Sequence, residues 1–88
     1  MINKKSTFLK LFNHIGEVHL FEYIINNMKK ESFEWNCNSV SRKKASETIQ
    51  LSEATIHRYL KNLGDYNILT NPHRGVYRVN RDNLNYID

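Results

Sequence analysis

The chain has 88 residues, of which 40% are hydrophobic and only one is cysteine, and its formal net charge is +4. This length supports one compact domain with one modest core, and a single cysteine excludes an internal disulfide or a metal site built from paired cysteines. No apolar run approaches the roughly 18 residues that span a bilayer, and Lys10 interrupts the apolar stretch that a secretory signal needs. We therefore expect one soluble, cytoplasmic domain over residues 1–88, with no membrane partner.

The positive charge is concentrated in the second half of the chain. Residues 1–41 carry five lysines and four glutamates, a net charge of +1, whereas residues 42–81 carry eight arginines and lysines and three acidic residues, a net charge of +5. A local excess of this size favours a polyanion as the partner.

The first half of the chain predicts two helices. A short N-terminal helical extension is expected over residues 6–15, interrupted by Gly16; its apolar residues at helical spacing are Phe8, Leu11, Phe12 and Ile15. A second helix is expected over residues 17–30, with Glu17 at its start and Lys29 and Lys30 at its end, where these charges suit the helix dipole. Its apolar stripe is Val18, Phe21, Ile24, Ile25 and Met28.

A strand is predicted after the second helix. Phe33, Trp35 and Cys37 alternate with polar residues, which is the period-two pattern of a half-buried strand. In this setting Cys37 is expected to be a small buried hydrophobic residue and not a nucleophile.

Two helices joined by a tight turn follow. The first covers residues 39–49, with Ser39 or Ser41 as its cap; its inward residues are Val40, Ala45 and Ile49. The turn at residues 50–52 ends at Ser52, which is expected to cap the next helix. Its inward residues are Ile56, Tyr59 or Leu60, and Leu63. Residues 64–67, GDYN, tolerate left-handed backbone and are expected to end this helix.

The chain then predicts a hairpin. Residues 68–70 and 76–79 are strand-like and flank NPHRG at 71–75, a turn cluster with a basic tip. The full order is helix, helix, strand, helix, tight turn, helix, hairpin. This order is typical of a winged helix-turn-helix, an α+β fold that is mostly helical, with three or four helices, a short strand and a C-terminal β-hairpin wing. The helix-turn-helix is placed at about 40–64 and the wing at about 67–80.

The run ASETIQLSEATIHRYLKNLGDYNIL, residues 45–69, resembles the winged helix-turn-helix consensus. The matching residues are Thr55, Ile56, Arg58, Leu60 and Leu63, followed by the approach to the wing at Asn67, Ile68 and Leu69. Two residues depart from it: Gln50 stands where glycine is preferred, and Ser46 replaces the usual alanine at the helix crossing. The turn must therefore accept a side chain at Gln50, at a small strain cost.

The run HRGVYRVNRDNL, residues 73–84, is similar to the small plasmid and phage replication proteins of the RepL type. The RepL resemblance implies a replication initiator or accessory factor. The winged-helix resemblance also allows a small transcriptional regulator.

The helix after Ser52 has a polar outward face if its apolar stripe faces the core. The N-terminal end of a recognition helix usually points into the major groove, which places Glu53, Ala54 and His57 near bases, with Glu53 accepting a hydrogen bond from cytosine. Arg58 and Lys61 then lie nearer the DNA backbone, and Asn62 reaches adenine only if the helix lies deep in the groove. The alternative is that this face is only a solvated surface.

Three cations, Arg42, Lys43 and Lys44, stand at the start of the helix over 39–49, where the dipole favours anions by about 0.3–1 kcal/mol per charge. A phosphate held by the amides behind Ser39 or Ser41 would remove this conflict. The alternative is compensation by nearby acidic residues, namely Glu31, Glu34 or Glu47.

The wing adds two arginines, Arg74 at its turn and Arg78 on the outgoing strand, which suit contacts with the DNA backbone or minor groove. Together, the predicted DNA-binding residues are Ser41, Arg42, Lys43, Lys44, Ser52, Glu53, Ala54, Thr55, His57, Arg58, Lys61, Arg74 and Arg78.

An enzyme is not expected. His14 and His19 do not share a helical face, and the chain has no glycine-rich phosphate loop. We therefore expect no metal, cofactor or small-molecule substrate, and a non-enzymatic protein that binds double-stranded DNA. The apolar residues of the N-terminal helix are expected to belong to the core; the alternative is that part of this stripe pairs two protomers into a homodimer that engages two half-sites.

Two other functions are open on the sequence. One is a protein-interaction module, such as an antirepressor or assembly factor, that uses the same fold without binding DNA. The other is a single-stranded nucleic-acid binder that uses Tyr59, Tyr66 and Tyr77, although the spacing of these tyrosines suggests a structural role.

Overall fold

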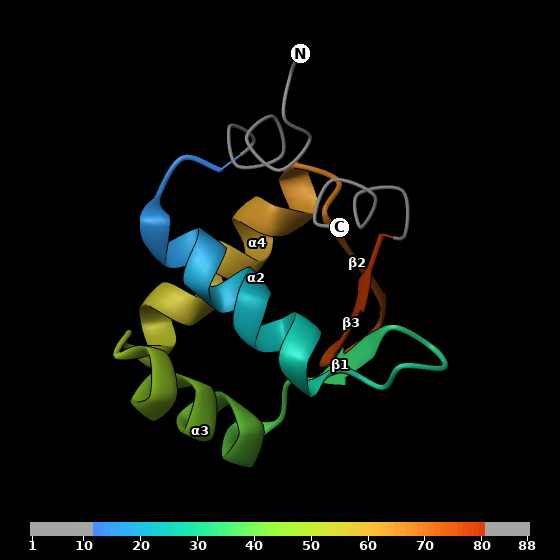
Figure 1. The fold of residues 1–88 in the computed structure, drawn as a ribbon, viewed down its shortest axis with the longest axis horizontal. Coiled ribbons are helices and arrows are strands. Elements are labelled where there is room, and N and C mark those ends of the chain that lie inside the picture. The colour runs from blue at the N-terminus through green and yellow to red at the C-terminus, as the bar shows by residue number, and fades with distance from the viewer. Residues whose placement is uncertain (1–11, 81–88) are drawn as a thin grey trace.

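The computed structural model describes residues 12–80, which form three helices and one three-stranded sheet (Figure 1). The elements are α2 (Ile15–Asn27), β1 (Glu34–Asn36), α3 (Ser39–Ile49), α4 (Glu53–Asp65), β2 (Leu69–His73) and β3 (Val76–Val79). Most of the helix predicted over 6–15 lies outside the described residues. Gly16 does not interrupt a helix, because α2 has already begun at Ile15, whose side chain is 72% exposed and takes no part in the core.

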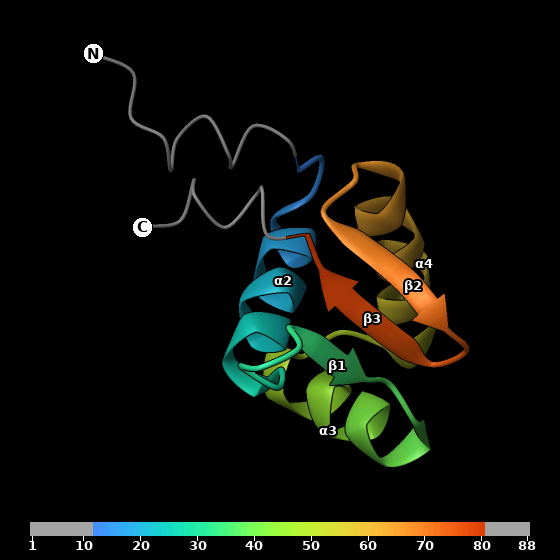
Figure 2. The same ribbon diagram turned by 90° about the vertical axis from the view of Figure 1, so that its right-hand side faces the viewer.

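The sheet joins the predicted strand to the predicted hairpin. β3 lies between β1 and β2 and is antiparallel to both, with Trp35 opposite Tyr77 and Leu69 opposite Val79. In Figure 2 the strands face the viewer and α4 lies behind β2. One helix, a strand, the α3–α4 pair and the β2–β3 hairpin make up a winged helix-turn-helix, which confirms the predicted fold class.

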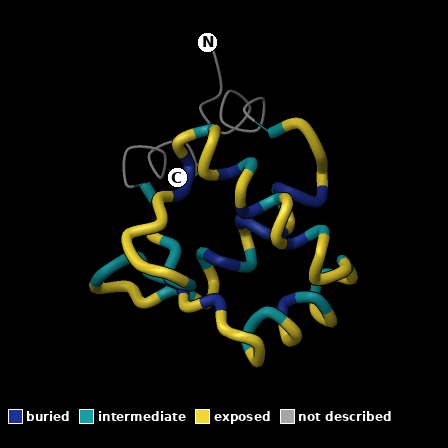
Figure 3. The backbone as a smooth tube through the Cα atoms, turned by 180° about the vertical axis from the view of Figure 1, so that it is seen from behind, coloured by how far each residue is buried: buried dark blue, intermediate teal, exposed yellow. Residues whose placement is uncertain are grey.

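The core lies where the helices and the sheet meet (Figure 3). The stripe predicted on α4 is confirmed, since Ile56, Leu60 and Leu63 are buried. On α2 the most deeply buried apolar side chains are Leu20, Phe21 and Ile24, while Val18, Ile25 and Met28 are half-buried. The core also contains Trp35, Cys37, Ala45, Ile68, Leu69 and Val79.

The inward face predicted for α3 is only partly right. Ala45 is fully buried and Ile49 packs against the core, but Val40 is 75% exposed. At 3.6 residues per turn, Val40 and Ala45 point about 140° apart around the helix axis. When Ala45 faces the core, Val40 must therefore face solvent.

Side-chain caps fix where α3 and α4 begin. The cap of α3 is Asn38, and not Ser39 or Ser41 as predicted, because Ser41 is the third helical residue of a reciprocal capping pair. The Ser41 amide donates to Asn38 Oδ1 at 2.8 Å, and the Asn38 amide donates to Ser41 Oγ at 2.9 Å. Ser52 caps α4 as predicted, accepting from the Thr55 amide at 3.1 Å.

The turn between α3 and α4 explains both departures from the consensus. Gln50 has left-handed backbone, with φ 57° and ψ 45°, so the turn accepts a side chain where glycine is preferred. The hydroxyl of Ser46 donates to the carbonyl of Leu51, across the turn. The residue that replaces alanine therefore supplies a hydrogen bond that alanine lacks.

The close approach of α2 to α4 depends on Gly16. A Cβ atom at Gly16 would lie 2.8 Å from Cε2 of Tyr59, whose ring stacks on His14 with 5.6 Å between centroids. We expect Gly16→Ala to lower the free energy of unfolding by about 1 kcal/mol, because overpacking outweighs the better helix propensity of alanine. Urea unfolding measures this change.

Gly64 provides the matched control within α4. A Cβ atom there would come no closer than 4.0 Å to the carbonyl oxygen of Leu69. Gly64→Ala should therefore raise the free energy of unfolding by about 0.5 kcal/mol. Equal stabilisation by both substitutions would contradict the proposed role of Gly16.

Candidate nucleic-acid interface

The polar face of α4 is open to solvent. Because its apolar stripe is buried, the predicted outward residues Glu53, Ala54, His57, Arg58 and Lys61 are all exposed. The guanidinium of Arg58 lies 5.7 Å from the centroid of the Tyr59 ring, a cation–π distance.

Ser52 and Thr55, two of the predicted DNA-binding residues, hydrogen-bond to each other at the start of α4. Ser52 Oγ donates to Thr55 Oγ1 at 2.8 Å while it accepts from the Thr55 amide. Ser52 Oγ therefore both donates and accepts within the helix terminus, and the longer charged side chains form the outward surface.

The start of α3 presents a lysine pair next to an internal ion pair. Lys43 and Lys44 are exposed, whereas Arg42 Nε donates to Glu53 Oε1 of α4 at 3.0 Å. The acidic partner is thus on α4, and not one of the three glutamates considered from the sequence. The three cations also follow the first turn of α3, since that helix begins at Ser39.

Ser41 is less available to a ligand than the sequence suggested. Its hydroxyl donates to the Asn36 carbonyl at 2.6 Å, and its amide is taken by the Asn38 side chain. The cations that remain open on α3 are therefore Lys43 and Lys44.

The tip of the wing is fastened beside the start of α3. Arg74 is exposed in the turn, and Gly75 follows it with a φ of 77°. The Cys37 amide donates to the Gly75 carbonyl at 2.7 Å, directly before the α3 cap at Asn38. The wing tip and the lysine-bearing helix are therefore neighbours, although they are far apart in the sequence.

A cleft lies between α4 and the wing. His57 and Lys61 line it from α4, and Thr70 and Asn71 line it from β2. The Asn71 side chain donates to the carbonyls of His73 and Val76, where the register of the hairpin shifts. α3, α4 and the wing thus form one continuous surface.

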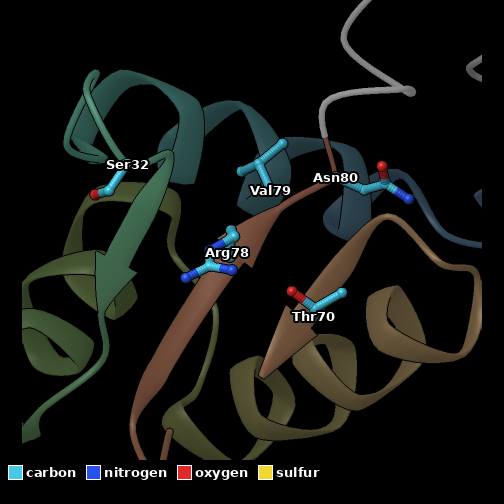
Figure 4. Close-up of a pocket in the computed structure, with 5 residues that line it drawn as sticks. All are labelled: Ser32, Thr70, Arg78, Val79 and Asn80. Carbon is cyan, nitrogen blue, oxygen red and sulfur yellow. The ribbon is translucent and has the colours of Figure 1, made fainter. Parts of the chain in front are cut away.

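Arg78 lies on β3, directly opposite Thr70 of β2. Val79, its neighbour on β3, is buried, so strand alternation places Arg78 on the opposite face of the sheet. Figure 4 shows it beside a shallow pocket that is also lined by Ser32, Thr70 and Asn80. Arg78 Nη2 pairs with Glu34 Oε2 at 2.7 Å, a contact between β3 and β1.

Five cations of the continuous surface have no carboxylate partner within residues 12–80, where the two ion pairs are Arg42–Glu53 and Arg78–Glu34. They are Lys43, Lys44, Arg58, Lys61 and Arg74. Unpaired cations on three adjoining elements suit a partner with regularly spaced negative charges.

The buried carboxylate of Glu17 contacts α4 on the side away from its exposed face. The sequence did not predict that this residue is buried. Glu17 is 0% exposed and accepts from the amides of Asn13 and His14 at 2.9 and 3.2 Å. Asn62 Nδ2 donates to Glu17 Oε2 at 2.8 Å, and the Tyr66 hydroxyl lies 3.1 Å from the same oxygen. Asn62 therefore points into the protein, so its conditional role as an adenine reader was wrong.

The hydrogen bonds to Glu17 favour the charged form of its carboxyl group. Burial raises the pKa of Glu17, but the hydrogen bonds from Asn62, from the two backbone amides and from Tyr66 lower it by more, so that the pKa lies below its ordinary value of 4.5. The sequence signal is an acidic residue in the first turn of a helix, which by itself indicates only a favourable interaction with the helix dipole.

Residues 12–80 also bear on three other kinds of site, for a metal ion, a membrane and single-stranded nucleic acid. No group of three His, Cys, Asp or Glu side chains there could hold a metal ion, and none of the described helices is long and apolar enough to cross a membrane. Tyr59, Tyr66 and Tyr77 are partly buried and pack against the core. These rings do not form the exposed stacking platform that single-stranded nucleic acid needs.

Comparison with known families agrees with the resemblance seen at the wing. Residues 6–86 match the family model described as Firmicute plasmid replication protein (RepL). No curated protein and no solved structure gave a significant match. Since the match covers nearly the whole chain, the protein belongs to the RepL family of Firmicute plasmid replication proteins.

Proposed function

We propose that the protein acts in plasmid replication by binding double-stranded DNA, with α4 in the major groove. One observation carries this proposal: the exposed face of α4 is continuous with the lysines of α3 and with the basic wing tip, and five cations on it lack a carboxylate partner among residues 12–80. Family membership favours replication over regulation of transcription as the process served.

Within this proposal, some side chains contact base edges and others contact phosphates. Glu53, Ala54 and His57 lie at the N-terminal end of α4, the end that usually meets base edges. Arg58 and Lys61, farther along the same helix, are suited to phosphates, as are Lys43 and Lys44 on α3 and Arg74 on the wing. The proposed role is non-enzymatic, and two copies bound as a homodimer would engage a symmetric pair of half-sites.

Salt dependence tests this proposal directly. Because each neutralised phosphate contributes a slope of about −0.9 in a plot of log affinity against log salt concentration, five contacts predict a slope of about −4 to −5. The measurement is the anisotropy of a labelled duplex, titrated with protein between about 50 and 300 mM salt.

Failure to bind any duplex near 50 mM salt, or affinity that does not change with salt, would overturn the proposal. A protein partner bound stoichiometrically under these conditions, without DNA, would instead favour the interaction-module hypothesis. A duplex selected from a random pool and carrying two-fold symmetry would support the homodimer.

A further inference from the structure

We propose that Glu53 is a specificity-determining residue that accepts a hydrogen bond from the N4 amino group of cytosine, and that Arg42 is its positioning residue. This inference rests on the proposed function, because it names the base that the same surface reads. The observation behind it is the ion pair that joins the start of α4 to α3.

The carboxylate of Glu53 is held at one oxygen and open at the other. Glu53 is the first residue of α4, directly after the Ser52 cap, and its side chain is 48% exposed. Oε1 accepts from Arg42 Nε at 3.0 Å, and Oε2 receives no hydrogen bond from any residue between 12 and 80. One acceptor therefore remains to meet a donor at the end of the helix that faces the groove.

Arg42 is itself held firmly. Its side chain is only 23% exposed, and its Nε already donates to Glu53 Oε1. A glutamate tied to such a residue has lost much of its rotamer freedom before DNA arrives. The entropic cost of ordering it in the complex is correspondingly smaller.

The chemistry of the major groove then selects the base. A carboxylate only accepts hydrogen bonds, and cytosine presents the N4 amino donor there, whereas guanine presents O6 and N7 and thymine presents O4, which are acceptors. Adenine offers an amino donor, but its N7 acceptor lies beside it. The Arg42 cation also offsets the repulsion between Glu53 and nearby phosphates.

Base selection from a random duplex pool tests the inference with wild type and Glu53→Gln. We expect wild type to prefer cytosine by about tenfold at one position of each half-site. Glutamine can both donate and accept, as adenine requires, so the variant should shift that one position toward adenine and leave the other positions unchanged. Glu47→Gln, which removes the same charge from an exposed site on α3, should leave the whole profile unchanged.

Arg42→Lys tests the positioning role separately. It keeps the charge but loses the planar guanidinium, so the cytosine preference should fall several-fold while the salt slope stays the same. A wild type that binds duplex DNA, together with identical base preferences in Glu53→Gln, would overturn this inference and leave the proposed function standing. A wild type that binds no duplex would overturn both.

Discussion

Replacement of Glu17 by alanine should lower the free energy of unfolding by about 2–4 kcal/mol, the range expected when a buried, charged hydrogen-bond network loses its centre. The carboxylate accepts from two backbone amides and from the side chains of Asn62 and Tyr66, and it is fully buried. Alanine would leave these donors without their carboxylate acceptor. Urea unfolding near pH 7 measures the loss.

Glu22 gives the matched control, because it is an exposed glutamate on the same helix. Glu22→Ala should change the free energy of unfolding by no more than about 0.5 kcal/mol. Glu17→Gln keeps one acceptor oxygen and should fall between the two alanine variants. A cost for Glu17→Ala that is no larger than that for Glu22→Ala would contradict the role of the network.

The pH dependence follows from the direction of the pKa shift. Because the pKa of Glu17 in the folded protein lies below its ordinary value of 4.5, the carboxylate contributes stability that is fully present above pH 4.5. That contribution is lost as the pH falls through the lowered pKa of the folded state. The stability difference between wild type and Glu17→Gln, which cannot ionise, should therefore be steady from neutral pH down to about pH 5 and shrink in more acidic solution.

Both ends of α4 are fastened to the rest of the protein by polar contacts. Near its C-terminal end, Asn62 and Tyr66 contact the Glu17 carboxylate of α2. At its N-terminal end, Glu53 pairs with Arg42 of α3. A helix held at both ends presents its exposed face in one orientation, so if α4 is the recognition helix of the proposed function, the ordering cost of binding DNA is smaller.

The features that were predictable from the sequence are those set by local signals. The period of Ile56, Leu60 and Leu63 and the cap at Ser52 placed α4 correctly. The run of turn residues placed the wing, although β2 extends through His73 and the turn is shorter than the predicted 71–75, with Gly75 at a φ of 77°. Each of these signals depends on a few neighbouring residues, so the rest of the fold is not needed to interpret them.

The features that were missed depend on partners distant in the sequence. Glu17 and Asn62 are separated by 45 positions and Arg42 and Glu53 by 11, so no local pattern pairs them. Arg78 is basic and lies in the wing, but it pairs with Glu34 of β1, which is 44 positions away in the sequence. Periodicity identifies which side of an element is polar, whereas tertiary packing decides whether that side meets solvent or another element.

Replacement of both lysines at the start of α3, Lys43→Gln with Lys44→Gln, should weaken duplex binding by about 30-fold near 100 mM salt and make the salt slope shallower by about 2. Both side chains are exposed and have no carboxylate partner among residues 12–80. Because phosphate contacts carry no direct sequence information, the loss should be similar for every duplex and the base preferences should not change. Anisotropy titrations at several salt concentrations measure both quantities.

Lys29 and Lys30 supply the matched control, since they are also a consecutive, exposed lysine pair but lie between α2 and β1. Their double glutamine variant has the same net charge as the Lys43 and Lys44 variant, so any effect of overall charge appears equally in both. If the surface formed by α3, α4 and the wing is the interface, only the α3 pair should change the slope by about 2. Equal losses in the two variants would show that affinity follows net charge and not the geometry of this surface.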